Sequence, residues 1–188
     1  MREIGQRYDQ EHGLTRELTK EIFAFIQLEK RSDYDLEKFL ISKGLTIDLW
    51  KQFTGEFFNS EYKNQFLYDL LLKAKIEKGI KILYTTNNSD GLNELIKKYE
   101  ISNLADAMVN SIDISLIKPD PVFWQKSYEK AQGMIANLST EEVLVIDDSD
   151  TNIESAKNMG FSAIKYSATE EVHTHLIEIL GLVSSGSE

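Results

Sequence analysis

The chain has 188 residues, and its 31 acidic and 21 basic side chains give a formal net charge of -10. That length predicts one compact domain, or one domain with a small insertion. Nucleic acids and anionic membranes both attract clustered Lys and Arg, so the acidic balance argues against either as a partner. The absence of cysteine excludes disulfides, thiolate nucleophiles and Cys-bound zinc, and it favours a cytoplasmic location.

Helical patterns extend from Leu14 to about Lys78, because apolar residues recur there at spacings of three and four. Polar residues at the expected helix ends can cap them. The expected caps are Thr15 or Thr19 for the first helix, Ser32 with Asp35 for the second, and Gly44 as the stop of the second. An aromatic stripe follows, with most members predicted on one helical face: Phe53, Phe57, Phe58, Tyr62, Phe66 and Leu70.

After Gly79 the pattern changes to alternating strands and helices, which predicts a parallel sheet covered on both faces. The expected strands are 81–86, 109–112 (a weaker candidate), 143–147 and 162–166. The expected helices are 91–99, 121–131, 151–159 and 169–180. No Gly/Pro/Ser linker separates this part from the helical one, which favours an insertion packed on a core.

Polar groups follow three of these elements, where a parallel sheet binds its ligands. Thr86 and Asn87 end the first strand, where a hydroxyl, an amide and backbone N–H groups can hold a phosphoryl oxygen or simply cap a helix. Lys118 is followed by the only two prolines of the chain, which restrain the backbone beside its ammonium group. Asp147 and Asp148 follow a strand, with Asn152 beyond them, and such oxygen ligands suit magnesium.

In this order, the three segments resemble the haloacid dehalogenase superfamily of aspartate-nucleophile phosphatases and related hydrolases over about residues 80–166. The resemblance implies an α/β fold with a Rossmann-like parallel sheet core. The helical first third looks like the cap that this family inserts between its first and second core strands. We therefore expect a cap at 1–63, a core at 64–182 and a flexible tail at 183–188.

The resemblance also implies roles for the site residues. Thr86 matches the hydroxyl that binds the phosphoryl group, and Asn87 is its neighbour. Lys118 matches the lysine that steadies the nucleophile and the phosphoryl group. Asp148 matches the carboxylate that binds magnesium, with Asp147 and Asn152 supporting the metal site.

One part of the family's pattern is not found in the sequence, namely a hydrophobic strand ending in Asp-x-Asp-Gly, whose first Asp is the nucleophile. Asp33 and Asp35 have the spacing but begin a helix, and Asp148 and Asp150 lack the glycine. The resemblance places this strand in the centre of the sheet. We therefore expect either that Met1 is not the natural start or that a partner segment completes the sheet.

The expected function is magnesium-dependent hydrolysis of a small phosphorylated or halogenated metabolite, with little or no activity in the chain as written. A non-catalytic module that binds phosphate or metal through Thr86, Lys118 and Asp148 is an open alternative. A receiver-like domain phosphorylated at Asp147 or Asp148 is another, although receiver domains carry their acidic pair early in the chain.

Overall fold

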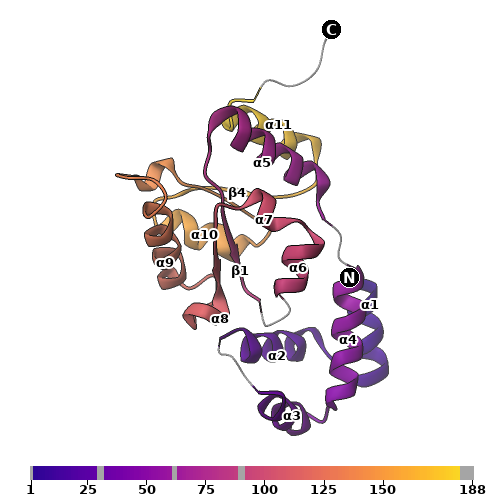
Figure 1. Ribbon diagram of the computed structural model, residues 1–188. Helices are drawn as coiled ribbons and strands as arrows, with labels where there is room; N and C mark the ends of the chain where they lie inside the picture. Colours follow the sequence, from indigo (N-terminus) through magenta and orange to yellow (C-terminus); the bar gives the residue numbers. More distant parts are fainter. Residues whose placement is uncertain (1, 29–31, 61–62, 89–91, 183–188) are drawn as a thin grey trace.

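The computed structural model describes residues 2–28, 32–60, 63–88 and 92–182. The helices that come first along the chain are α1 Arg2–His12, α2 Arg16–Leu28, α3 Asp33–Ser42 and α4 Ile47–Ser60. They gather at one end of the molecule, away from α5 and α11, with α2 beside α8 (Figure 1). Their shared core contains Tyr8, Ile22, Leu40 and Phe53, each at most 2% exposed, and draws all its members from residues 4–57.

The predicted caps of this helical part are confirmed. Thr15 Oγ1 accepts a hydrogen bond of 3.1 Å from the Leu18 N–H and so satisfies one free donor at the start of α2. Ser32 and Asp35 cap α3 reciprocally through side chain and backbone. Gly44 follows this helix with a φ of +77°, a conformation that residues with a Cβ rarely adopt.

The prediction of one long aromatic face is wrong in part. α4 ends at Ser60, and a separate helix, α5 Gln65–Lys78, begins after Asn64, whose side chain accepts a hydrogen bond from the Leu67 N–H. Phe66 therefore lies on α5, where it is 37% exposed and stacks on His173 with ring centroids 3.6 Å apart. Tyr62 lies outside the described residues. The helix α1 was not among the predicted elements.

The rest of the described chain alternates strands with helices, as predicted. The strands are β1 Leu83–Thr86, β2 Ala107–Asn110, β3 Leu144–Asp147 and β4 Ser162–Lys165. The helices are α6 Leu92–Lys98, α7 Ile101–Leu104, α8 Ser111–Ile114, α9 Pro121–Gln132, α10 Asp150–Asn158 and α11 Glu170–Ile179, with a 3-10 turn at Thr140–Glu142. Strand β2 begins two residues before its predicted range and gives way at Ser111 to α8. The predicted tail at 183–188 lies outside the described residues.

The strands pair in parallel within two sheets, β1 with β2 and β3 with β4. Helices cover both faces. On one face, α5 and α11 form a core with Leu144 and Ile146 of β3 (Figure 1). On the other face, α9 and α10 pack on Val145 and on Leu83 of β1. The carboxyl ends of β1 and β3 carry the polar residues singled out in the sequence.

The start of α9 is fixed by a proline and a side-chain cap. Pro121 is the first residue of α9, and the Asp120 side chain accepts a hydrogen bond of 2.8 Å from the Val122 N–H.

No helix in the described part of the chain is long and apolar enough to cross a membrane.

Candidate functional site

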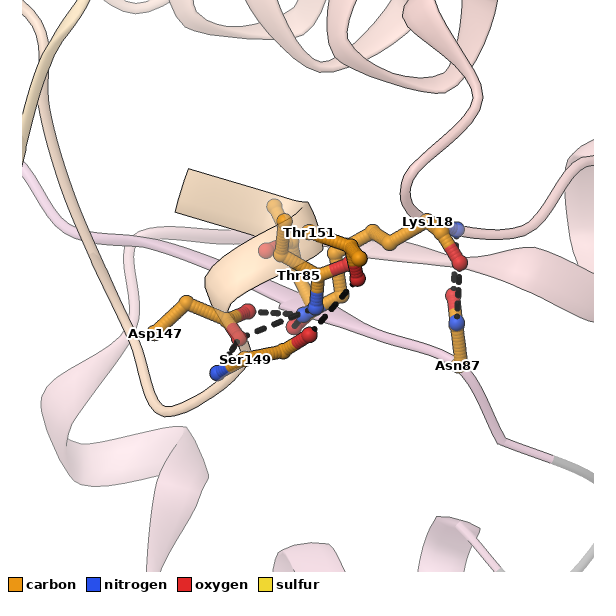
Figure 2. A network of polar contacts seen from close by, with 7 residues as sticks. Thr85, Asn87, Lys118, Asp147, Ser149 and Thr151 are labelled. Atoms are coloured by element: carbon orange, nitrogen blue, oxygen red, sulfur yellow. Dashed lines mark hydrogen bonds and ion pairs between the residues drawn. The ribbon is translucent and has the colours of Figure 1, made fainter. Parts of the chain in front are cut away.

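Lys118 joins the carboxyl ends of β1 and β3. Its Nζ donates a hydrogen bond of 3.2 Å to the Thr85 carbonyl and lies 2.8 Å from Asp147 Oδ2 (Figure 2). The side chains of Lys118 and Asp147 are only 11% and 7% exposed. The Trp124 ring, centred 5.9 Å from Nζ, packs near the same cation. Because the Lys118 ammonium group is largely shielded from water, these partners fix its position.

Asn87 fixes the backbone from which this lysine extends. Its Oδ1 accepts a hydrogen bond of 2.8 Å from the Lys118 N–H, and its Nδ2 donates one of 2.9 Å to the Lys118 carbonyl (Figure 2). The two bonds tie the end of β1 to the loop before α9. Ser155 Oγ holds the same loop by donating a hydrogen bond of 2.5 Å to the Pro119 carbonyl. Asn87 is therefore a positioning residue for Lys118.

Asp147 is ionised at neutral pH, and both of its carboxylate oxygens accept hydrogen bonds. Burial alone would raise its pKa, but the Lys118 charge and hydrogen bonds from Lys118, the Ser149 N–H and Asn152 hold the pKa of this carboxyl below its ordinary value. The Ser149 N–H and Asn152 Nδ2 each donate to Oδ1 at 2.9 Å. Asn152 thus supports Asp147 directly, whereas the sequence interpretation assigned both residues to the support of Asp148.

Asp148 differs from Asp147, because its side chain is exposed and no hydrogen bond or ion pair is recorded for it within the described residues. Magnesium in proteins is commonly held by one or two carboxylates together with water and phosphate oxygens. The exposed Asp148 carboxylate, next to the hydrogen-bonded Asp147, fits this mode of magnesium binding. No group of three or more acidic, His or Cys side chains suited to a metal occurs among the described residues.

The structure brings Asn87, Lys118, Asp147 and Asn152 into one hydrogen-bonded network. Thr86 is the last residue of β1 and is partly buried, with no side-chain hydrogen bond recorded in the described part of the chain. Asp148 stands next to the network in sequence but takes no part in it.

Sequence reasoning missed three groups at this site. Two are backbone groups, the Thr85 carbonyl and the Ser149 N–H, which carry no side-chain signal. The third is Gln27 of α2, whose Nε2 donates a hydrogen bond of 3.1 Å to the Asn87 carbonyl. Only the pairing of α2 with the core could have indicated it, because 60 residues separate the two in sequence.

Residues 67–166, more than half of the chain, match the family described as haloacid dehalogenase-like hydrolase. The chain belongs to that family. No match was found among curated proteins.

Solved structures share the fold. A haloacid dehalogenase family enzyme from Bacteroides thetaiotaomicron is 18% identical with a TM-score of 0.67, over 90% of this chain and 88% of that one. That structure is an aspartate-to-alanine mutant in complex with magnesium and inorganic phosphate. A family hydrolase from Porphyromonas gingivalis is 15% identical with a TM-score of 0.69, over 94% of this chain and 90% of that one. The fold is therefore that of the family, a Rossmann-type α/β core with a helical segment.

Proposed function

We propose that the edge formed by Thr86, Lys118 and Asp148 binds a phosphoryl group together with magnesium, as in a magnesium-dependent phosphatase acting on a small phosphorylated metabolite. The observation that carries the proposal is the buried Lys118 ammonium held between Thr85 and Asp147 at the carboxyl ends of two strands. A fixed cation there can neutralise a phosphoryl oxygen without reorganising when the ligand arrives. A halogenated metabolite is a second substrate class open to this lineage.

Each residue has a distinct part. The Thr86 hydroxyl donates to a phosphoryl oxygen, and Lys118 offsets the phosphoryl charge. Asp148, which is exposed, supplies the metal with a carboxylate oxygen, while Asp147 and Asn152 keep the lysine and the start of α10 in place. Bound magnesium supplies charge neutralisation for the phosphoryl group. Asn87 positions the loop that carries Lys118, and Gln27 of α2 holds the Asn87 carbonyl directly after β1.

We also propose that these 188 residues hydrolyse such a metabolite slowly or not at all. The sequence contains no strand followed by Asp-x-Asp-Gly, the segment that provides the nucleophile and the acid/base in the family pattern. Removal of a catalytic nucleophile typically lowers kcat by about a thousandfold to a millionfold.

A non-catalytic module that binds phosphate and metal is the second candidate. It is favoured by the same combination of features, since Thr86, Lys118 and Asp148 are present while the nucleophile segment is not found. Such a module would bind phosphate and magnesium without hydrolysing a phosphate ester.

Release of p-nitrophenol from p-nitrophenyl phosphate tests the inactivity that both candidates share. We expect no magnesium-dependent turnover above that of a Lys118→Met control, together with saturable binding of phosphate. Turnover comparable with intact phosphatases, abolished in the Lys118→Met variant, would contradict the predicted inactivity and leave the phosphatase assignment standing. Turnover that the variant retains would contradict the site itself.

A further inference from the structure

The peptide group that joins Asn87 to Asn88 is held at both of its polar atoms. Its carbonyl oxygen, which belongs to Asn87, accepts the hydrogen bond of 3.1 Å from Gln27 Nε2. Its N–H, which belongs to Asn88, donates a hydrogen bond of 3.1 Å to Ser111 Oγ. The carbonyl and the N–H of a planar trans peptide point in opposite directions, so the two bonds together fix the orientation of the group.

The two supports of this peptide group come from different parts of the molecule. Ser111 begins α8, is fully buried and also donates a hydrogen bond of 3.3 Å to the Asn88 carbonyl. Gln27 lies in the last turn of α2, which packs beside α8 (Figure 1). The α/β part therefore fixes one end of the peptide group, and the helical part fixes the other.

Gln27 differs from its neighbours on α2. Phe23 and Ile26 pack against the core of the helical part, whereas Gln27 is only partly buried and its recorded hydrogen bond leaves that part for the end of β1. The amide of Gln27 is thus directed at Asn87 and not at the core on which α2 depends. Removal of the amide alone should leave the packing of α2 in place.

The fixed peptide group leads directly to the buried cation. The Asn87 side chain extends from the same residue and binds the backbone of Lys118 twice, through its Oδ1 and its Nδ2 (Figure 2). Lys118 Nζ in turn lies 2.8 Å from Asp147 Oδ2. A continuous series of hydrogen bonds therefore runs from Gln27 through Asn87 to the Lys118 ammonium group.

We propose that Gln27 is a positioning residue for Lys118, which it orients through the Asn87–Asn88 peptide and the Asn87 side chain. The helical part thereby raises the phosphate affinity of the site without contact between Gln27 and the phosphate. This role rests on the proposed function, because phosphate is the ligand assigned to Lys118.

Residue-resolved hydrogen exchange on the full chain, without any ligand, tests the link to Lys118. Gln27→Met keeps the length of the side chain and removes its donor. We expect the Lys118 amide, which donates to Asn87 Oδ1, to exchange on the order of tenfold faster in this variant. The Val122 amide, which donates to Asp120 in the same loop, should not change.

The matched control variant is Gln52→Met in α4. Gln52 is exposed, and its Nε2 donates a hydrogen bond of 3.4 Å to Glu56 within the same helix. It makes the same substitution in the helical part without touching the site, so the Lys118 amide should exchange at its original rate.

Calorimetric titration of inorganic phosphate in the presence of magnesium then measures the effect on binding. Gln27→Met should weaken phosphate binding about fivefold, the change that loss of one hydrogen bond typically brings, and Gln52→Met should leave it unchanged.

The two measurements separate this role from the proposed function. Absence of phosphate binding to the unmodified chain would overturn the proposed function, while exchange at Lys118 still decides whether Gln27 orients the lysine. Unchanged exchange at Lys118 in Gln27→Met, or equal acceleration at Val122, would overturn the role of Gln27 as a positioning residue. So would equal acceleration at Lys118 in Gln52→Met. Faster exchange with unchanged phosphate affinity would overturn its effect on binding.

Discussion

The Lys118–Asp147 ion pair is the most buried of those formed between described residues. Removing one member of such a pair leaves the other charge without compensation, and we expect Asp147→Asn to lower the free energy of unfolding by about 3 kcal/mol. Urea unfolding at neutral pH measures it. The matched control is Asp150→Asn, since Asp150 is 80% exposed and pairs with Lys165 at the surface. Equal effects of the two substitutions would contradict the structural importance of the buried pair.

Asp106 controls a pH-dependent part of the stability. Burial alone would raise its pKa, but the Ile82 N–H at 2.9 Å and the Lys75 and Lys81 ammonium groups hold the pKa of this carboxyl below its ordinary value. A carboxyl with a lowered pKa stabilises the fold fully above its unfolded pKa of about 3.9, and that contribution is lost as the pH falls through the folded value.

Asp106→Asn should therefore lower the free energy of unfolding by about 1 kcal/mol at pH 7. The difference from the unmodified chain should narrow below about pH 4, where both carry a neutral side chain at this position. Urea unfolding across this pH range measures both quantities. A difference that stays constant or widens on acidification would show that the Asp106 charge is not what stabilises β1 against β2.

The sequence could identify the side chains of the site but not its backbone groups. Asn87, Lys118, Asp147 and Asn152 each follow a strand or adjoin the prolines, which makes them predictable from the sequence, and the structure joins them in one network. The Thr85 carbonyl could not be selected, because every residue has a carbonyl and only the folded chain brings one to Lys118.

Helix ends depend on single residues, and Gly79 is the clearest case. It ends α5 with a φ of +67°, while its N–H donates to the Lys75 carbonyl at 3.1 Å. A side chain is strained in this conformation, so Gly79→Ala should lower the free energy of unfolding by about 1 kcal/mol. Thermal and urea unfolding both report this quantity.

Gly5 provides the control for that substitution. It lies inside α1, and a Cβ added there meets nothing within 4 Å. Gly5→Ala should raise the free energy of unfolding by about 0.5–1 kcal/mol, because glycine is a poor helix former. If both alanines changed stability in the same direction, the left-handed conformation assigned to Gly79 would be wrong.

Elements with strong local signals were predictable. β3 and β4 and the helices α9 and α10 lie within two residues of their predicted ranges, because apolar runs or a proline start define them. The single aromatic face failed because spacing alone did not reveal the break between α4 and α5, where Asn64 caps a new helix. The spacing of four from Phe58 to Tyr62 and Phe66 continues across that break.

Three hydrophobic clusters are formed by the described residues. One is built from residues 4–57 alone, and the others combine helices with the strands. The boundary between cap and core at residues 63 and 64 stays a prediction. Contacts between the two parts include the hydrogen bond from Gln27 of α2 to the Asn87 carbonyl, so α2 contacts the core at the residue that follows β1.

Phe53→Ala tests whether the helical part loses structure on its own. Phe53 is 2% exposed and packs edge-on against Tyr8 with ring centroids 5.2 Å apart, so its truncation should cost about 3–5 kcal/mol. Hydrogen exchange should then speed up in α1 to α4 and stay unchanged in β3 and β4. The control is Phe66→Ala, which removes a half-exposed ring outside this core. Equal acceleration in β3 and β4 would mean that the whole molecule unfolds as one unit.

The assignment of the phosphate site is tested most directly by calorimetric titration of inorganic phosphate, with and without magnesium, into the full chain and its Lys118→Met variant. Lys118 supplies the buried cation of the site, and Asp148 the free carboxylate. We expect saturable phosphate binding that requires magnesium and weakens at least about tenfold, equivalent to 1.4 kcal/mol, in the folded variant. Phosphate binding that is absent from the unmodified chain, or that is unchanged by Lys118→Met, would contradict the account.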